Sequence, residues 1–99
     1  MYLVRDIMYC HPGKARPMVD RFKALSKVIA KMGAGTMRIT TDFSAERYWT
    51  VVAEMEVASV DQHLEMARKA MELPETQEAM KGYHDLVIEG RREIYVIES

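Results

Sequence analysis

Side chains alternate between apolar and polar in four stretches of the chain, and this period of two predicts β-strands. The four stretches are residues 2–10, 36–42, 48–57 and 86–98. The third has the cleanest alternation, with an unbroken apolar face made of Trp49, Val51, Ala53, Met55 and Val57. The first is apolar on both faces, so we expect it to be covered on both sides of a sheet.

The apolar spacing changes to three and four residues in two other stretches, which predicts amphipathic helices. Over residues 16–32 the apolar stripe consists of Met18, Phe22, Leu25, Ile29 and Met32. The second helix follows Ser59, which forms a capping-box pattern with Gln62, and it ends before Pro74. A short further helix is predicted over residues 75–82, before the closing strand.

These elements follow one another as strand, helix, strand, strand, helix, strand, which is the ferredoxin-like βαββαβ order of an α+β protein. Right-handed crossovers then place the two main helices on one face of a four-stranded antiparallel sheet. No linker, repeat or low-complexity tract interrupts the pattern, so residues 1–99 are predicted to form one domain. Apolar residues on the remaining sheet face predict that a second copy of the chain covers it, giving a homodimer.

Composition and charge narrow the range of partners. The formal net charge is −1 over 99 residues, so the chain lacks the basic surface that nucleic acids and anionic membranes select. No apolar run approaches the roughly 20 residues that cross a bilayer. Arg5 and Asp6 place charge too early for a secretory signal, and Cys10 is the only cysteine, which rules out a disulfide within the chain. We therefore predict a cytoplasmic protein that binds neither nucleic acid nor membrane.

His63 is the residue that we expect to act as a general base, because it flanks the apolar stripe of the second helix and histidine titrates near neutral pH. Trp49 and Tyr9 are predicted to stack against an aromatic substrate from the sheet side of the same pocket. Tyr83 and His84, where the chain re-enters the sheet, are predicted to be polar groups of that pocket. The alternative interpretation gives all of these residues structural roles, in the core or in a surface turn.

Metal and cofactor sites are not indicated by the sequence. The histidines at positions 11, 63 and 84 lack the i,i+4 spacing of helical zinc motifs, and a single cysteine cannot build a multi-cysteine site. Cys10 is expected to be a small buried hydrophobe. We predict neither a metal nor a bound cofactor.

Two short motifs add a family resemblance to this pattern. The His11-Pro12-Gly13-Lys14 turn, the closing Gly90-Arg91-Arg92-Glu93-Ile94-Tyr95 segment and the βαββαβ order resemble the dimeric α+β barrel superfamily. Its antibiotic-biosynthesis-monooxygenase-like and NIPSNAP-like branches are the most similar. The resemblance implies two sheets packed face to face, with a pocket between each sheet and its helices.

Members of this superfamily include cofactor-independent monooxygenases, haem-degrading enzymes and isomerases, so the fold alone limits function weakly. The haem-degrading members use an Asn, a Trp and a His, and some quinone-forming monooxygenases use an Asn, a Trp and an Arg. This sequence contains no asparagine, so Trp49 and His63 match at most two of three such positions.

Two functional hypotheses follow. The first is a homodimer that binds a small apolar or aromatic metabolite and acts as a cofactor-independent monooxygenase, with O2 as oxidant, or as an isomerase. The second is a non-catalytic ligand-binding or scaffold module. An enclosed cavity beside His63 would favour the first hypothesis, whereas filling of that space by Met66, Met71 and Met80 would favour the second.

Overall fold

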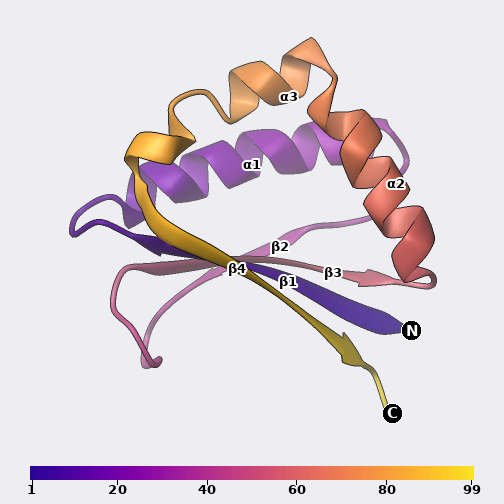
Figure 1. Cartoon of the computed structure of the whole chain (residues 1–99), viewed down its shortest axis with the longest axis horizontal. Helices are drawn as coiled ribbons and strands as arrows, with labels where there is room; N and C mark the ends of the chain where they lie inside the picture. The colour runs from indigo at the N-terminus through magenta and orange to yellow at the C-terminus, as the bar shows by residue number, and fades with distance from the viewer.

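The computed structural model describes residues 1–99 and has two layers, a four-stranded sheet and a layer of helices on one of its faces (Figure 1). The strands are β1 (Tyr2–Cys10), β2 (Arg38–Thr41), β3 (Thr50–Val57) and β4 (Val87–Val96). The helices are α1 (Ala15–Lys31), α2 (Val60–Met71), α3 (Pro74–Ala79) and the 3₁₀ turn η1 (Tyr83–Asp85). The strand order is β2-β3-β1-β4 and every neighbouring pair is antiparallel, which confirms the predicted ferredoxin-like α+β fold.

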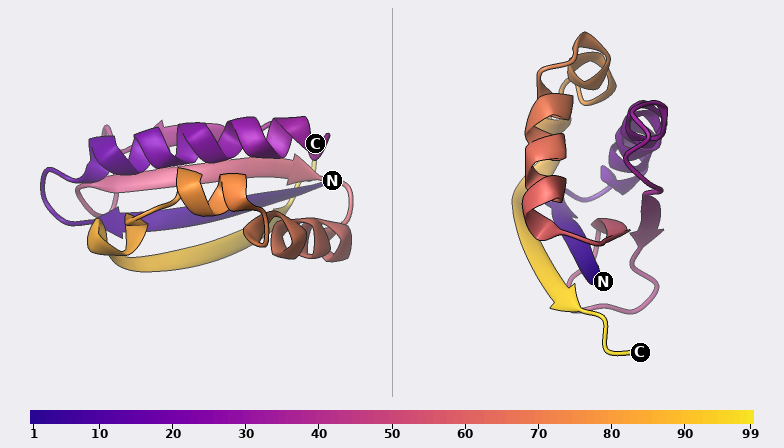
Figure 2. Two further views of the ribbon diagram at one scale, coloured as in Figure 1. Left: turned by 90° about the horizontal axis from the view of Figure 1, so that it is seen from above. Right: turned by 90° about the vertical axis from the view of Figure 1, so that its right-hand side faces the viewer.

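The helices divide the covered face of the sheet between them. α1 contacts β2 and β3, whereas α2 and α3 lie over the side of the sheet that contains β1 and β4 (Figure 2). α1 begins and ends within one residue of its predicted bounds, because its apolar stripe and the glycines after it define both ends.

The main core lies beneath α1. Met18 and Phe22 of α1 pack with Val51 and Ala53 of β3, and Cys10 of β1 joins the same buried cluster. Burial raises the pKa of the Cys10 thiol, because a thiolate is poorly solvated there. The prediction of a small buried hydrophobe at this position is therefore confirmed.

The start of β3 corrects the sequence prediction. The strand begins at Thr50 and not at Tyr48, because Trp49 has a φ of +60°, in the left-handed region that side chains with a Cβ seldom adopt. The turn is held by Asp42, whose carboxylate accepts a hydrogen bond from the Thr50 N–H at 2.9 Å. Trp49 therefore belongs to the turn before the strand, where it is 42% exposed. β2 is likewise shorter than predicted, with Arg38–Thr41 in place of residues 36–42.

A bulge near the start of β4 is the second correction. Glu89 pairs with Tyr9, but Val87 pairs with Cys10, so Ile88 is an extra residue without a partner on β1. Val87 consequently packs against the core under the helices, while Ile88 is exposed. For the residues before Glu89, the bulge therefore shifts by one residue the predicted alternation of side chains between the two faces of the sheet.

The sheet face opposite the helices, here called the open face, carries a cross-strand ladder of ion pairs. Arg5 of β1 contacts Glu54 of β3 and Glu93 of β4, each at 3.2 Å. Arg38 of β2 donates to the same Glu54 at 2.8 Å. The apolar centre of this face consists of Ile7, Tyr9 and Val52. No helix covers the open face (Figure 1). None of the helices combines the length and apolar character needed to cross a bilayer.

Candidate functional site

The first turn of α2 positions His63. Ser59 is the N-cap residue, and its hydroxyl oxygen accepts the Gln62 N–H at 3.2 Å, which is one half of the predicted capping box. The His63 N–H donates to the Ser59 carbonyl at 3.1 Å, so the imidazole belongs to the first full turn. That turn directs the ring towards the sheet, and His63 is only 8% exposed.

A cavity of about 140 Å³ lies beside His63, between α1, α2 and the sheet. Most of its wall is apolar. The lining residues are Val4, Asp6, Leu25, Ile29, Met37, Ala53, Met55, His63, Met66, Ala67, Ala70, Met71 and Arg92. Met66 and Met71 therefore form part of the wall without filling the space, and Met80 packs elsewhere, in the main core.

The His63 ring has an incomplete hydrogen-bond environment. Its Nδ1 is buried and has no partner in the chain, whereas buried polar atoms in proteins are usually paired. Burial lowers the pKa of His63, the Arg92 charge lowers it further, and the Asp6 charge opposes them. The imidazole is therefore neutral at pH 7, with one ring nitrogen able to accept a proton.

Asp6 and Arg92 form the charged rim of the cavity. They are register partners on β1 and β4, and the Arg92 Nε donates to the Asp6 carboxylate at 2.7 Å. The other guanidinium nitrogens of Arg92 make no hydrogen bond within the chain. Neither residue was among the predicted site residues. The available signal was a carboxylate on the face of β1 that is otherwise apolar, the face of Val4, Met8 and Cys10.

Tyr9 and Trp49 do not lie beside His63, so the predicted arrangement of these two rings as walls of its pocket is wrong. Tyr9 points to the open face, where the Arg47 guanidinium lies 3.9 Å from the centre of its ring. Trp49 occupies the left-handed turn before β3, near the opposite end of β1 from the His63 cavity. The cause is geometric: Tyr9 alternates away from the helices, and the turn removes Trp49 from the strand.

Tyr83 and His84 are likewise remote from the cavity, at the end of the sheet where η1 joins β4 (Figure 1). Their rings lie against each other, with centroids 4.0 Å apart. Tyr83 packs against the main core, and His84 is exposed. The structure therefore does not bring the predicted polar pair to His63.

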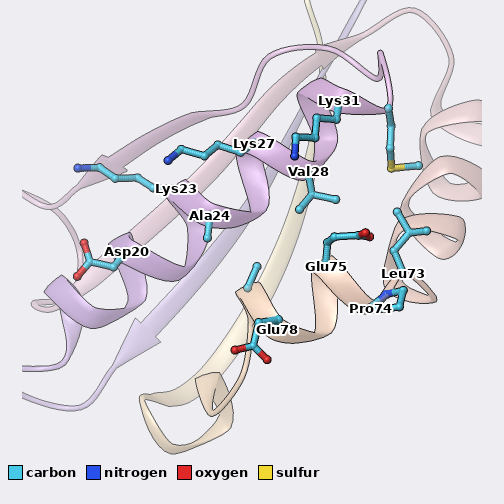
Figure 3. A pocket seen from close by; sticks show the side chains of 12 residues that line it. Asp20, Lys23, Ala24, Lys27, Val28, Lys31, Leu73, Pro74, Glu75 and Glu78 are labelled. Carbon is cyan, nitrogen blue, oxygen red and sulfur yellow. The ribbon is translucent and has the colours of Figure 1, made fainter.

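A groove of about 930 Å³ lies between α1 and α3 (Figure 3). Lys23, Lys27 and Lys31 form a row along α1, and Glu75 and Glu78 project from α3. All five side chains are exposed at the rim of the groove. The groove is wide open and holds no imidazole or buried unpaired polar atom, so the smaller His63 cavity is the better candidate for chemistry.

Comparison with known proteins finds similarity at the level of structure. The sequence matches no protein-family model and no curated protein. An uncharacterised NIPSNAP-like domain protein from Burkholderia xenovorans superposes with a TM-score of 0.80 at 16% identity, covering 99% of this chain and 85% of that one. A second NIPSNAP domain protein from that organism gives a TM-score of 0.82 at 12% identity, covering 100% and 96%.

A protein from Nitrosomonas europaea, whose name places it with the antibiotic biosynthesis monooxygenases, gives a TM-score of 0.70 at 14% identity over 100% of both chains. Identities this low establish the fold and leave the chemistry open. The chain therefore has the fold shared by NIPSNAP-like domain proteins and by proteins named as antibiotic biosynthesis monooxygenases.

Proposed function

We propose that the His63 cavity binds a small apolar or aromatic metabolite and that His63 removes a proton from it. The observation that carries the proposal is a buried histidine, with an Nδ1 atom that has no partner, among the residues that line a mostly apolar cavity. A ligand that donates to this nitrogen would complete its hydrogen bonding, while the apolar walls hold the rest of the molecule.

A neutral imidazole is an effective base near pH 7. Proton removal leaves an anion beside the Arg92 guanidinium, which stabilises it electrostatically. Return of the proton to another carbon gives an isomerisation. Reaction with O2 instead converts a CH2 group to a carbonyl, with one oxygen atom retained and the other leaving as water with both hydrogens. Neither route needs a bound metal or cofactor, and the name of the Nitrosomonas europaea protein supports the oxygenase route.

We further propose that two chains pair through their open faces. Support comes from Tyr95 of β4, which is exposed on the same face as Glu93, and from Phe43, which is fully exposed in the loop beside that face. Large exposed aromatic side chains of this kind are typical of protein interfaces. We also propose a cytoplasmic location, because a chain with a single cysteine suits a reducing compartment.

The test is a thermal-shift and turnover screen with hydroquinones of one to three rings and with short lactones. A ligand at about 100 times its Kd stabilises by roughly 2.7 kcal/mol. Each kcal/mol raises the Tm of a domain this size by roughly 4–8 °C. We expect one chemical class to raise the Tm and to be consumed, with O2 uptake if the route is oxidative.

His63→Gln should retain binding but lower kcat by about 10²-fold or more, because the amide cannot act as a base. His11→Gln replaces an exposed histidine outside the cavity and serves as the matched control. Equal turnover by His63→Gln would remove His63 from the mechanism. Absence of any shift or turnover would favour the non-catalytic module.

A further inference from the structure

We infer that the His63 cavity selects a single six-membered ring bearing an ionisable hydroxyl group, that is, a phenol or a cyclic enol. This inference rests on the proposed function and specifies its substrate class. It excludes the fused-ring substrates that would need a larger space.

The size limit comes from the packing around the cavity. Its volume of about 140 Å³ is close to the roughly 150 Å³ of an engineered apolar cavity that holds one benzene molecule. Leu25 and Ile29 of α1 form one wall, and Ala67 and Ala70 of α2 form the facing wall. A second fused ring would exceed this volume, so it would have to displace lining side chains or extend past the Asp6–Arg92 rim, out of the apolar space.

The hydroxyl preference comes from where polar groups lie. His63, Asp6 and Arg92 are the polar members of the lining, and Asp6 is already paired with Arg92. The buried Nδ1 of neutral His63 needs a donor, which a hydroxyl supplies and a carboxylate does not. Arg92 disfavours a cationic amine and favours a ligand oxygen that becomes negative.

The step that follows is a proton transfer without redox change. The ligand O–H bond breaks, the proton moves to His63 Nδ1, and the electron pair stays on the oxygen and its ring. Arg92 then stabilises the oxyanion. Asp6, which accepts from the Arg92 Nε at 2.7 Å, is a positioning residue for the guanidinium.

The experiment measures Kd by calorimetry for phenol, toluene and 2-naphthol at pH 7, with wild-type protein and three variants. Toluene has the same ring without the hydroxyl, and 2-naphthol adds one ring. We expect 2-naphthol to bind at least about tenfold more weakly than phenol, a difference of 1.4 kcal/mol.

His63→Leu should lower the phenol-to-toluene affinity ratio by about tenfold, because the loss of one hydrogen bond weakens phenol binding by about that factor. Toluene binding should change little. His63→Gln keeps an acceptor oxygen and should retain most of that ratio. In addition, the ultraviolet spectrum of bound phenol should show ionisation at a lower pH than in free phenol. In Arg92→Met, bound phenol should no longer ionise at a lower pH than free phenol.

The outcomes separate the two proposals. Equal or tighter binding of 2-naphthol, still dependent on His63, overturns the size limit and leaves the proposed function intact. An unchanged phenol-to-toluene ratio in His63→Leu overturns the hydroxyl contact. Ionisation of bound phenol that is unaffected by Arg92→Met overturns the role of Arg92. Failure of all three probes to bind, with no ligand from the wider screen, overturns the proposed function itself.

Discussion

His63 combines nearly complete burial with a ring nitrogen that has no partner. An unsatisfied buried polar atom costs about 1–3 kcal/mol, so packing alone does not explain a histidine here. A structural histidine would have a backbone or side-chain partner for Nδ1. The cavity next to the ring has room for the ligand that we propose as that partner.

The lowered pKa of His63 gives a stability prediction. Its pKa in the folded protein lies below its ordinary value of 6.5, so the unfolded chain takes up the proton first as the pH falls. Stability from this residue is thus present above pH 6.5 and is lost as the pH falls towards the folded pKa. The limiting slope is about 1.4 kcal/mol per pH unit for one proton.

Urea unfolding of wild type and His63→Gln between pH 7.5 and 5 measures this effect directly. All other titrating groups cancel in the difference between the two proteins. The unfolding free energy of wild type, relative to that of His63→Gln, should fall as the pH is lowered. A difference in unfolding free energy that does not change with pH would contradict the assignment of a neutral buried imidazole.

The N-terminus of α2 determines where His63 lies, so its cap should affect both stability and the site. Ser59→Ala removes the acceptor of the Gln62 N–H and should cost about 1 kcal/mol, because that donor then loses its partner within the chain. Ser26→Ala removes only a hydroxyl that donates within α1 to the Lys23 carbonyl, and it serves as the control. Equal unfolding free energies for the two variants would argue against the cap.

The elements themselves were largely predictable from the sequence. β1 and α1 follow directly from apolar periodicity, since the side chains that define the period are those that are buried. The left-handed turn at Trp49 and the bulge at Ile88 were not predictable, because each is a backbone event with no distinctive side-chain pattern. The turn takes Trp49 out of the strand, and the bulge shifts the alternation of side chains at Ile88.

The candidate site was predictable only in part. His63 stood out because its residue type and its place beside an apolar stripe are local features. Asp6 and Arg92 are 86 residues apart in the chain, and only the pairing of β1 with β4 brings them together. A cavity is harder still to predict from the sequence, because it depends on how several apolar side chains pack and on the space that they leave unfilled.

The molecule as a whole has two different faces, one covered by helices and one open. If the open faces pair, Phe43→Glu should raise the dimer Kd at least about tenfold, since aromatic residues often dominate interfaces. The side chain is fully exposed in the single chain, so the fold should be unaffected. Sedimentation equilibrium measures the Kd, and circular dichroism checks the fold.

Leu64→Glu provides the matched control, because Leu64 is an exposed apolar residue on the helical layer. It should leave the dimer intact. A dimer that survives Phe43→Glu but dissociates in Leu64→Glu would place the interface on the helices. A wild-type protein that stays monomeric at high concentration would contradict pairing altogether.

A cavity-filling variant tests most sharply whether ligands bind beside His63. Ala67 lines the cavity, so Ala67→Leu should occupy it, with an unchanged or higher Tm in the absence of ligand. Ala24→Leu makes the same change in the groove between α1 and α3. We predict that calorimetry will show loss of phenol and toluene binding in Ala67→Leu and retention in Ala24→Leu. Binding that survives in Ala67→Leu and disappears in Ala24→Leu would contradict the account and move the site to the groove.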